Sequence, residues 1–169
     1  MSELFIAKTM PEKDWSQVSK PNGCGRIITD NNLGVYVADA RQGDVNGKAT
    51  IILPQWSDGT LHNPLSQERT KATAAIEGGV VLYVDNPGVE LDLPKMPGYI
   101  KQALLSGDFK PGAIKQWDAI AQGLDYAGLD FDSVSRVLGA SLGAHVASAI
   151  VHTAPGEVHL ERLDLWETA

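Results

Sequence analysis

The chain has 169 residues, of which 43% are hydrophobic and 21% are charged, so it suits one globular domain that buries roughly two-thirds of its unfolded surface. Its 14 basic and 21 acidic residues give a formal net charge of −7 without any run of lysine or arginine, which argues against binding to nucleic acid or to an anionic membrane. The single cysteine, Cys24, cannot form an internal disulfide, so nothing requires an oxidising compartment.

The sequence shows no targeting or membrane-spanning segment. Residues 1–8 lack the basic start and the apolar run of about 7–15 residues that a secretion signal needs. The longest apolar runs, such as residues 79–84, are far shorter than the roughly 20 residues that span a bilayer. We therefore expect a protein of the cytoplasm or of another soluble compartment.

The chain divides into a short arm and one domain. Residues 1–24 show no clear hydrophobic period, so we expect an irregular N-terminal arm there and a folded domain over residues 25–169. Two β-rich runs follow at 26–29 and 35–38, and the Asn and Gly residues between them tolerate positive φ, which predicts a β-hairpin. The apolar run at 49–53 is typical of a strand that is covered on both faces.

From residue 64 onwards, helical and strand patterns alternate. Leu65, Ala72 and Ile76 recur at helical spacings and predict a helix over residues 64–77. The later elements are a strand at 80–84, a helix behind Pro111 with Ile114, Trp117, Ala121 and Leu124 on one period, a strand at 136–138, a helix at 142–151 and a last strand at 158–165. The sequence thus predicts an α/β fold: a mostly parallel sheet with an antiparallel N-terminal hairpin and helices on both faces.

A G-x-S-x-G motif occupies residues 139–143, between a predicted strand and a predicted helix. Such a motif makes a sharp turn that holds the serine hydroxyl above the strand ends, and its glycines leave room for that turn. The strand before it is apolar and the helix after it is rich in small residues, which is the context of a nucleophile elbow. We therefore expect Ser141 to be a nucleophile at a strained turn, with Gly139 and Gly143 as the elbow glycines.

Together with segments 51–56 and 84–88, this motif resembles the α/β-hydrolase family over about residues 25–169. The resemblance implies a serine hydrolase that acts on ester or acyl bonds, with a small ester as a possible substrate. It also implies an oxyanion hole formed by the backbone N–H groups of Leu142 and of Gln55 or Trp56; losing one such donor costs about 3–4 kcal/mol. In the alternative interpretation, the segment around Gln55 only ends a strand.

The family order is nucleophile, acid and histidine, on a sheet of about eight strands. Only residues 142–169 follow Ser141, and one helix and one strand nearly fill them. The resemblance therefore implies a hydrolase fold truncated after its sixth strand, with an incomplete triad.

His62 is the histidine best placed to act as a base or to contact substrate, because its loop follows the third strand at the active-site side of the sheet. The other histidines are expected to be structural residues of the last helix and strand: His145, His152 and His159. Asp164 and Glu167 are candidates for the acid that orients a histidine, or else solvated carboxylates at the end of a strand. No zinc-binding or phosphate-loop pattern is present, so we expect neither a metal nor a cofactor.

Two functions are compatible with these patterns. The first is a hydrolase-like protein in which His62 or a histidine of another chain activates Ser141; without a well-placed base we expect little esterase turnover by the isolated chain. The alternative is a non-catalytic structural or interaction subunit of a larger assembly that retains half a hydrolase fold. A separate chain could also complete the sheet.

The last strand is expected to contact another polypeptide, either a second copy or a different chain. The segment from Val158 to Trp166 would leave one side of its backbone unpaired, and an unpaired strand is a template for another strand. Its apolar side chains would lie bare without a partner: Leu160, Leu163, Leu165 and Trp166. We expect such a contact to bury more than about 1,000 Å².

Overall fold

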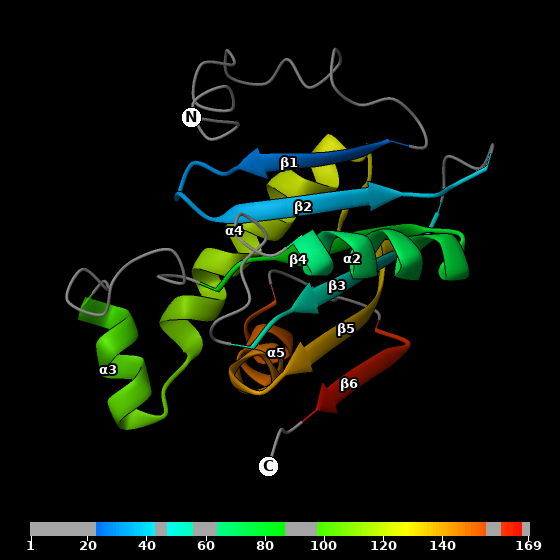
Figure 1. Ribbon diagram of the computed structural model, residues 1–169. Helices are drawn as coiled ribbons and strands as arrows, with labels where there is room; N and C mark the ends of the chain where they lie inside the picture. The colour runs from blue at the N-terminus through cyan, green and yellow to red at the C-terminus, as the bar shows by residue number, and fades with distance from the viewer. Residues whose placement is uncertain (1–22, 43–46, 56–63, 87–97, 155–159, 167–169) are drawn as a thin grey trace.

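The computed structural model describes residues 23–42, 47–55, 64–86, 98–154 and 160–166 (Figure 1). Its six strands are β1 (Cys24–Ile28), β2 (Gly34–Asp39), β3 (Ala49–Leu53), β4 (Val80–Val84), β5 (Val134–Ala140) and β6 (Arg162–Trp166). Its helices are α2 (Pro64–Glu77), α3 (Gly98–Ser106), α4 (Lys110–Tyr126) and α5 (Leu142–Thr153), with a short 3₁₀ turn at Phe131–Ser133. The arm expected at residues 1–24 lies almost wholly outside the described residues.

The strands form one sheet in the order β1-β2-β4-β3-β5-β6. β2 runs antiparallel to both β1 and β4, whereas β4, β3, β5 and β6 are parallel to one another. The N-terminal hairpin and the mostly parallel sheet are therefore confirmed.

Helices cover both faces of this sheet, as predicted. α2 packs on one face against β2 and β4 (Figure 1). On the other face, α4 contacts β2 and β4, and α5 contacts β3, β5 and β6. Among the described residues, no helix has the length and apolar character that crossing a membrane requires.

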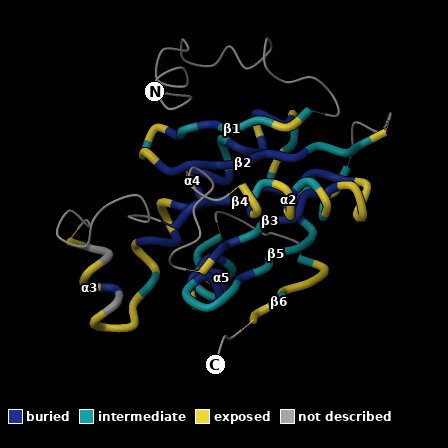
Figure 2. Tube along the Cα trace, in the orientation of Figure 1, coloured by how far each residue is buried: buried dark blue, intermediate teal, exposed yellow. Residues whose placement is uncertain are grey.

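The main core lies between the sheet and the pair α4 and α5. The Trp117 indole N–H donates to the Ile150 carbonyl over 2.9 Å, and its ring meets Phe131 edge to face, which ties α4 to α5. Burial is greatest in the central strands, while β6 is largely exposed (Figure 2). The centre of the sheet is therefore the most deeply buried part of the described fold.

Helix α2 has the predicted bounds, but two of the apolar residues whose spacing predicted it do not face the sheet. Leu65 and Ile76, whose spacing predicted the helix, are 64% and 86% exposed. Ser66, Thr70 and Ala74 face the sheet instead. These small residues let the helix approach the sheet closely, and the Thr70 hydroxyl is satisfied by the Ser66 carbonyl at 2.6 Å.

Three further elements differ markedly from the sequence expectation. β5 is longer than the predicted 136–138 and runs directly into the motif, and α3 was not predicted at all. β6 begins at Arg162, four residues after the predicted start, and residues 155–159 lie outside the described part.

Candidate active site

Ser141 lies in the turn between β5 and α5, where the sequence places it. Its backbone has φ 53° and ψ −118°, and within the described residues only Asn32 is another non-glycine residue with positive φ. This conformation is costly for a residue with a side chain and is typical of a strained turn at a functional site. The Ser141 N–H donates to the Trp166 carbonyl over 2.7 Å, which anchors the turn to the end of β6.

The two glycines of the motif permit this turn to pack closely. A Cβ at Gly139 would lie 2.8 Å from the Ala144 Cα and still nearer to the Gly143 carbonyl. A Cβ at Gly143 would lie 2.6 Å from the Pro54 carbonyl oxygen and collide with that of Leu53. The start of α5 is therefore in direct backbone contact with the end of β3. We call this side, where β3, β4 and β5 finish, the elbow end of the sheet.

The expected oxyanion donors lie at the elbow end as far as the structure describes them. Gln55 follows β3 and is exposed. Leu142 is the first residue of α5, and the first N–H groups of a helix have no partner within the helix and carry its positive dipole end. An anion that forms at Ser141 would be stabilised by such N–H groups. Trp56 lies outside the described residues.

The structure describes some of the candidate histidines and acids and not others. His62, His159 and Glu167 lie outside the described residues. On α5, the exposed His145 ring stacks on Phe109 with 5.5 Å between ring centroids, and His152 Nδ1 is 2.7 Å from the Ser148 carbonyl. Both rings thus make contacts typical of structural helix residues.

Asp164 is held by two arginines. Arg136 Nε donates to Oδ2 over 2.6 Å and Arg162 Nε donates to Oδ1 over 2.8 Å, and the Asp164 side chain is 12% exposed. Burial alone would raise the pKa of this carboxyl, but the hydrogen bonds and charges of Arg162 and Arg136 outweigh burial and hold the pKa below its ordinary value. The Asp164 carboxylate is therefore ionised and already neutralised.

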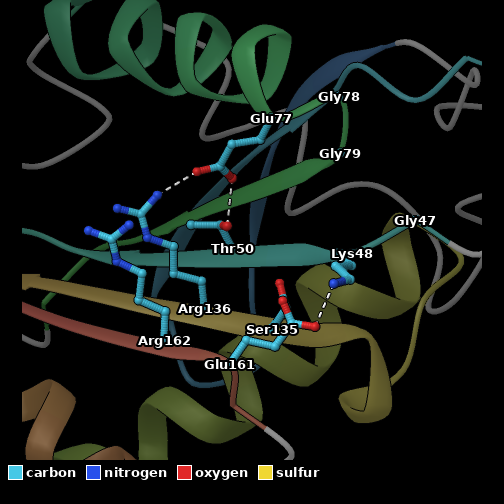
Figure 3. Close-up of a pocket in the computed structure, with 10 residues that line it drawn as sticks. All are labelled: Gly47, Lys48, Thr50, Glu77, Gly78, Gly79, Ser135, Arg136, Glu161 and Arg162. Carbon is cyan, nitrogen blue, oxygen red and sulfur yellow. Dashed lines mark hydrogen bonds and ion pairs between the residues drawn. The ribbon is translucent and has the colours of Figure 1, made fainter.

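These arginines belong to a cleft of about 500 Å³ at the opposite end of the strands, where β3, β4, β5 and β6 begin (Figure 3). We call this side the charged end. Glu77, at the end of α2, accepts hydrogen bonds from Arg136 at 2.6 Å and from Thr50 at 2.7 Å, and Lys48 pairs with Glu161 (Figure 3). Since its charges pair with one another, the cleft offers little net charge to a ligand.

Sequence reasoning did not predict the charged end. The signal available was a cation at the start of each of two neighbouring strands, Arg136 and Arg162. A charge in a strand that packs under a helix needs a partner, because an unpaired buried charge is strongly disfavoured. That argument would have paired Arg136, whose side chain is 23% exposed, with a carboxylate such as Asp164.

No protein-family model and no curated protein matches the sequence. Solved structures match the fold. The Francisella virulence factor BioJ matches 98% of this chain and 54% of its own, with 13% identity and a TM-score of 0.58. A sugar hydrolase (YeeB) from Lactococcus lactis matches 86% of this chain and 54% of its own, with 13% identity and a TM-score of 0.55.

A hyperthermophilic esterase from the archaeon Pyrobaculum calidifontis matches 94% of this chain and 54% of its own, with 16% identity and a TM-score of 0.52. The chain thus spans about half the length of these structures. At such low identity the likeness concerns the fold alone. Over the part that the structure describes, the chain has the α/β-hydrolase fold.

Proposed function

We propose that the protein is a serine hydrolase that acts on ester or acyl bonds, with Ser141 as its nucleophile. The observation that carries the proposal is the positive φ of Ser141 at the turn between β5 and α5. A strained serine between two glycines that cannot carry a Cβ is the geometry of a nucleophile elbow. Esterases among the structures with the same fold support the same class of reaction.

In the proposed reaction, the Ser141 Oγ attacks the carbonyl carbon of the ester while a base takes its proton. The carbonyl π electrons move onto the oxygen, and the N–H of Leu142 and of Gln55 or Trp56 stabilise the resulting oxyanion. Collapse of this intermediate expels the alcohol, which receives the proton back from the base. Water then hydrolyses the acyl-enzyme by the same steps.

The base is proposed to be His62 or a histidine of another chain. Of the two candidate acids, Asp164 is already neutralised by Arg136 and Arg162, which leaves Glu167 as the better candidate to orient a histidine. An unactivated serine hydroxyl is a weak nucleophile. We therefore expect only weak turnover of a short-chain activated ester by the isolated chain.

A fluorophosphonate probe, which forms a covalent bond with an activated serine, tests the proposal. We expect the wild-type chain to be labelled at Ser141, the S141A variant to be unlabelled, and H62A to be labelled much more slowly. Ser148→Ala, which removes another serine hydroxyl on the neighbouring helix, is the matched control and should label like the wild type. Equal labelling of wild type and S141A would overturn the proposal and would agree with the alternative of a non-catalytic subunit.

The expected contact of the last strand with another polypeptide stays a prediction. β6 is at one side of the sheet, and its Leu163, Leu165 and Trp166 side chains are exposed in the chain by itself. Covering each of them would contribute roughly 1.5–3 kcal/mol. Sedimentation at micromolar concentration should show an associated species that W166S weakens; a stable wild-type monomer would contradict it.

A further inference from the structure

Two buried amide side chains lie beside the loop that follows β3. Asn86, just after β4, and Gln116, in α4, are 2% and 0% exposed. The Asn86 Nδ2 donates to the Pro54 carbonyl over 2.6 Å and lies 3.4 Å from the Gln55 carbonyl. The Asn86 Oδ1 accepts from Gln116 Nε2 over 3.2 Å. The two amides therefore link α4 to the backbone of the loop through consecutive hydrogen bonds.

Burying these two amide side chains costs more free energy than burying apolar side chains in the same place. Ala113, Trp117 and Ile120, the buried neighbours of Gln116 on α4, are all apolar. The Gln116 Oε1 is buried without a hydrogen-bond partner in the described part of the chain, and leaving such a group unpaired costs about 1–3 kcal/mol. An apolar side chain would avoid that cost, so packing alone does not explain the amide at position 116.

The hydrogen bond to Pro54 fixes more than the carbonyl that it touches. A peptide unit is planar and trans, so the Pro54 carbonyl and the Gln55 N–H belong to one rigid plane and point in opposite directions. On its other flank the Pro54 carbonyl lies against Gly143 at the start of α5. The hydrogen bond from Asn86 therefore restrains the peptide plane that also carries the Gln55 N–H.

We infer that Asn86 and Gln116 are positioning residues that hold the Gln55 N–H as an oxyanion donor. This inference rests on the proposed function. A donor stabilises a developing oxyanion most when it is held in place before the reaction, because reorientation during the reaction costs free energy. Asn86 acts on the loop directly, and Gln116 holds Asn86.

The test uses N86D, which keeps nearly the side-chain volume, and N86L, which keeps the branched shape; both remove the amide donor to Pro54. Q116L removes the outer amide. Gln122→Leu is the matched control, because Gln122 is another α4 amide, whose Oε1 accepts from the Asp30 backbone N–H away from the loop. For N86L and N86D we expect fluorophosphonate labelling and ester kcat to fall about 10- to 100-fold, with KM changed less than about 3-fold. Q116L should show a smaller loss, and Q122L none.

Hydrogen exchange of the peptide that contains Gln55 gives a readout that does not depend on activity. We expect exchange there to be faster in N86L and N86D than in the wild type and unchanged in Q122L. Unchanged exchange in a folded N86D or N86L would overturn the inference, as would wild-type labelling rates in these variants. If the wild type itself is not labelled at Ser141, the proposed function fails, and with it the role of the loop as an oxyanion donor.

Discussion

The elbow end and the charged end of the same strands are built in opposite ways. At the elbow end, backbone atoms touch: Gly143 lies against the carbonyls of Leu53 and Pro54, and buried amides fix the loop. At the charged end, long side chains meet across a cleft, and several of them are partly exposed, such as Lys48 and Arg162. Backbone contacts cannot relax, whereas exposed side chains can turn aside. Substitutions should therefore lower the free energy of unfolding strongly at the elbow end and less at the charged end.

The largest effect is expected from a methyl group at the elbow. Gly143→Ala places a Cβ against two carbonyl groups, so the helix start or the end of β3 must shift, and we expect a loss of about 3 kcal/mol in the free energy of unfolding. Gly98→Ala is the control, because a Cβ there meets no atom within 4 Å. Urea unfolding measures both; equal midpoints would mean that the elbow tolerates a Cβ at Gly143 as well as an open position does.

A smaller effect is expected at the charged end. Asp164→Asn removes the charge that pairs with Arg136 and Arg162, and we expect a loss of about 1–2 kcal/mol in the free energy of unfolding. Because folding lowers the Asp164 pKa, this contribution is present above its ordinary value of 3.8 and is lost as the pH falls through the lowered pKa. Unfolding curves across that range should converge for wild type and D164N. A constant gap down to strongly acidic pH would contradict the assignment.

The smallest effect is expected from removing the backbone strain at Ser141. Glycine adopts a positive φ without strain, whereas alanine, like serine, does not. We therefore expect S141G to be more stable than S141A by about 1 kcal/mol. Thermal unfolding of the two variants measures the difference, and neither should react with a fluorophosphonate. Equal stability would show that the turn stores no backbone strain.

Local signals predicted the fold where they were strong. The bounds of α2 follow from the proline at its start and the two glycines after its end, and β3 and β4 are short apolar runs with clear stops. α3 lacks such signals, and it packs against α4. The buried face of α2 does not follow from hydrophobicity, which ranks Leu65 above Ser66, because it is the smaller Ser66 that lies against the sheet.

The candidate site was predictable only in part, for a similar reason. The elbow is a contiguous motif, so Ser141 and its glycines are recognisable in the sequence. Asn86 and Gln116 come from separate elements, and a glutamine among apolar helix residues reads as a solvent-facing position. Only the parallel pairing of β3 with β4 brings Asn86 beside Pro54.

The position of β3 between β4 and β5 has a consequence for synthesis. β3 can pair with β4 early, but its other side must wait for β5, which is made much later. During this interval the backbone beside Ile51 and Leu53, both fully buried in the folded protein, is open to pairing with a neighbouring nascent chain. Pairing between distant segments is also slow. Until residues 134–140 are made, one side of β3 therefore stays open to pairing with another chain, which favours rapid completion of the sheet.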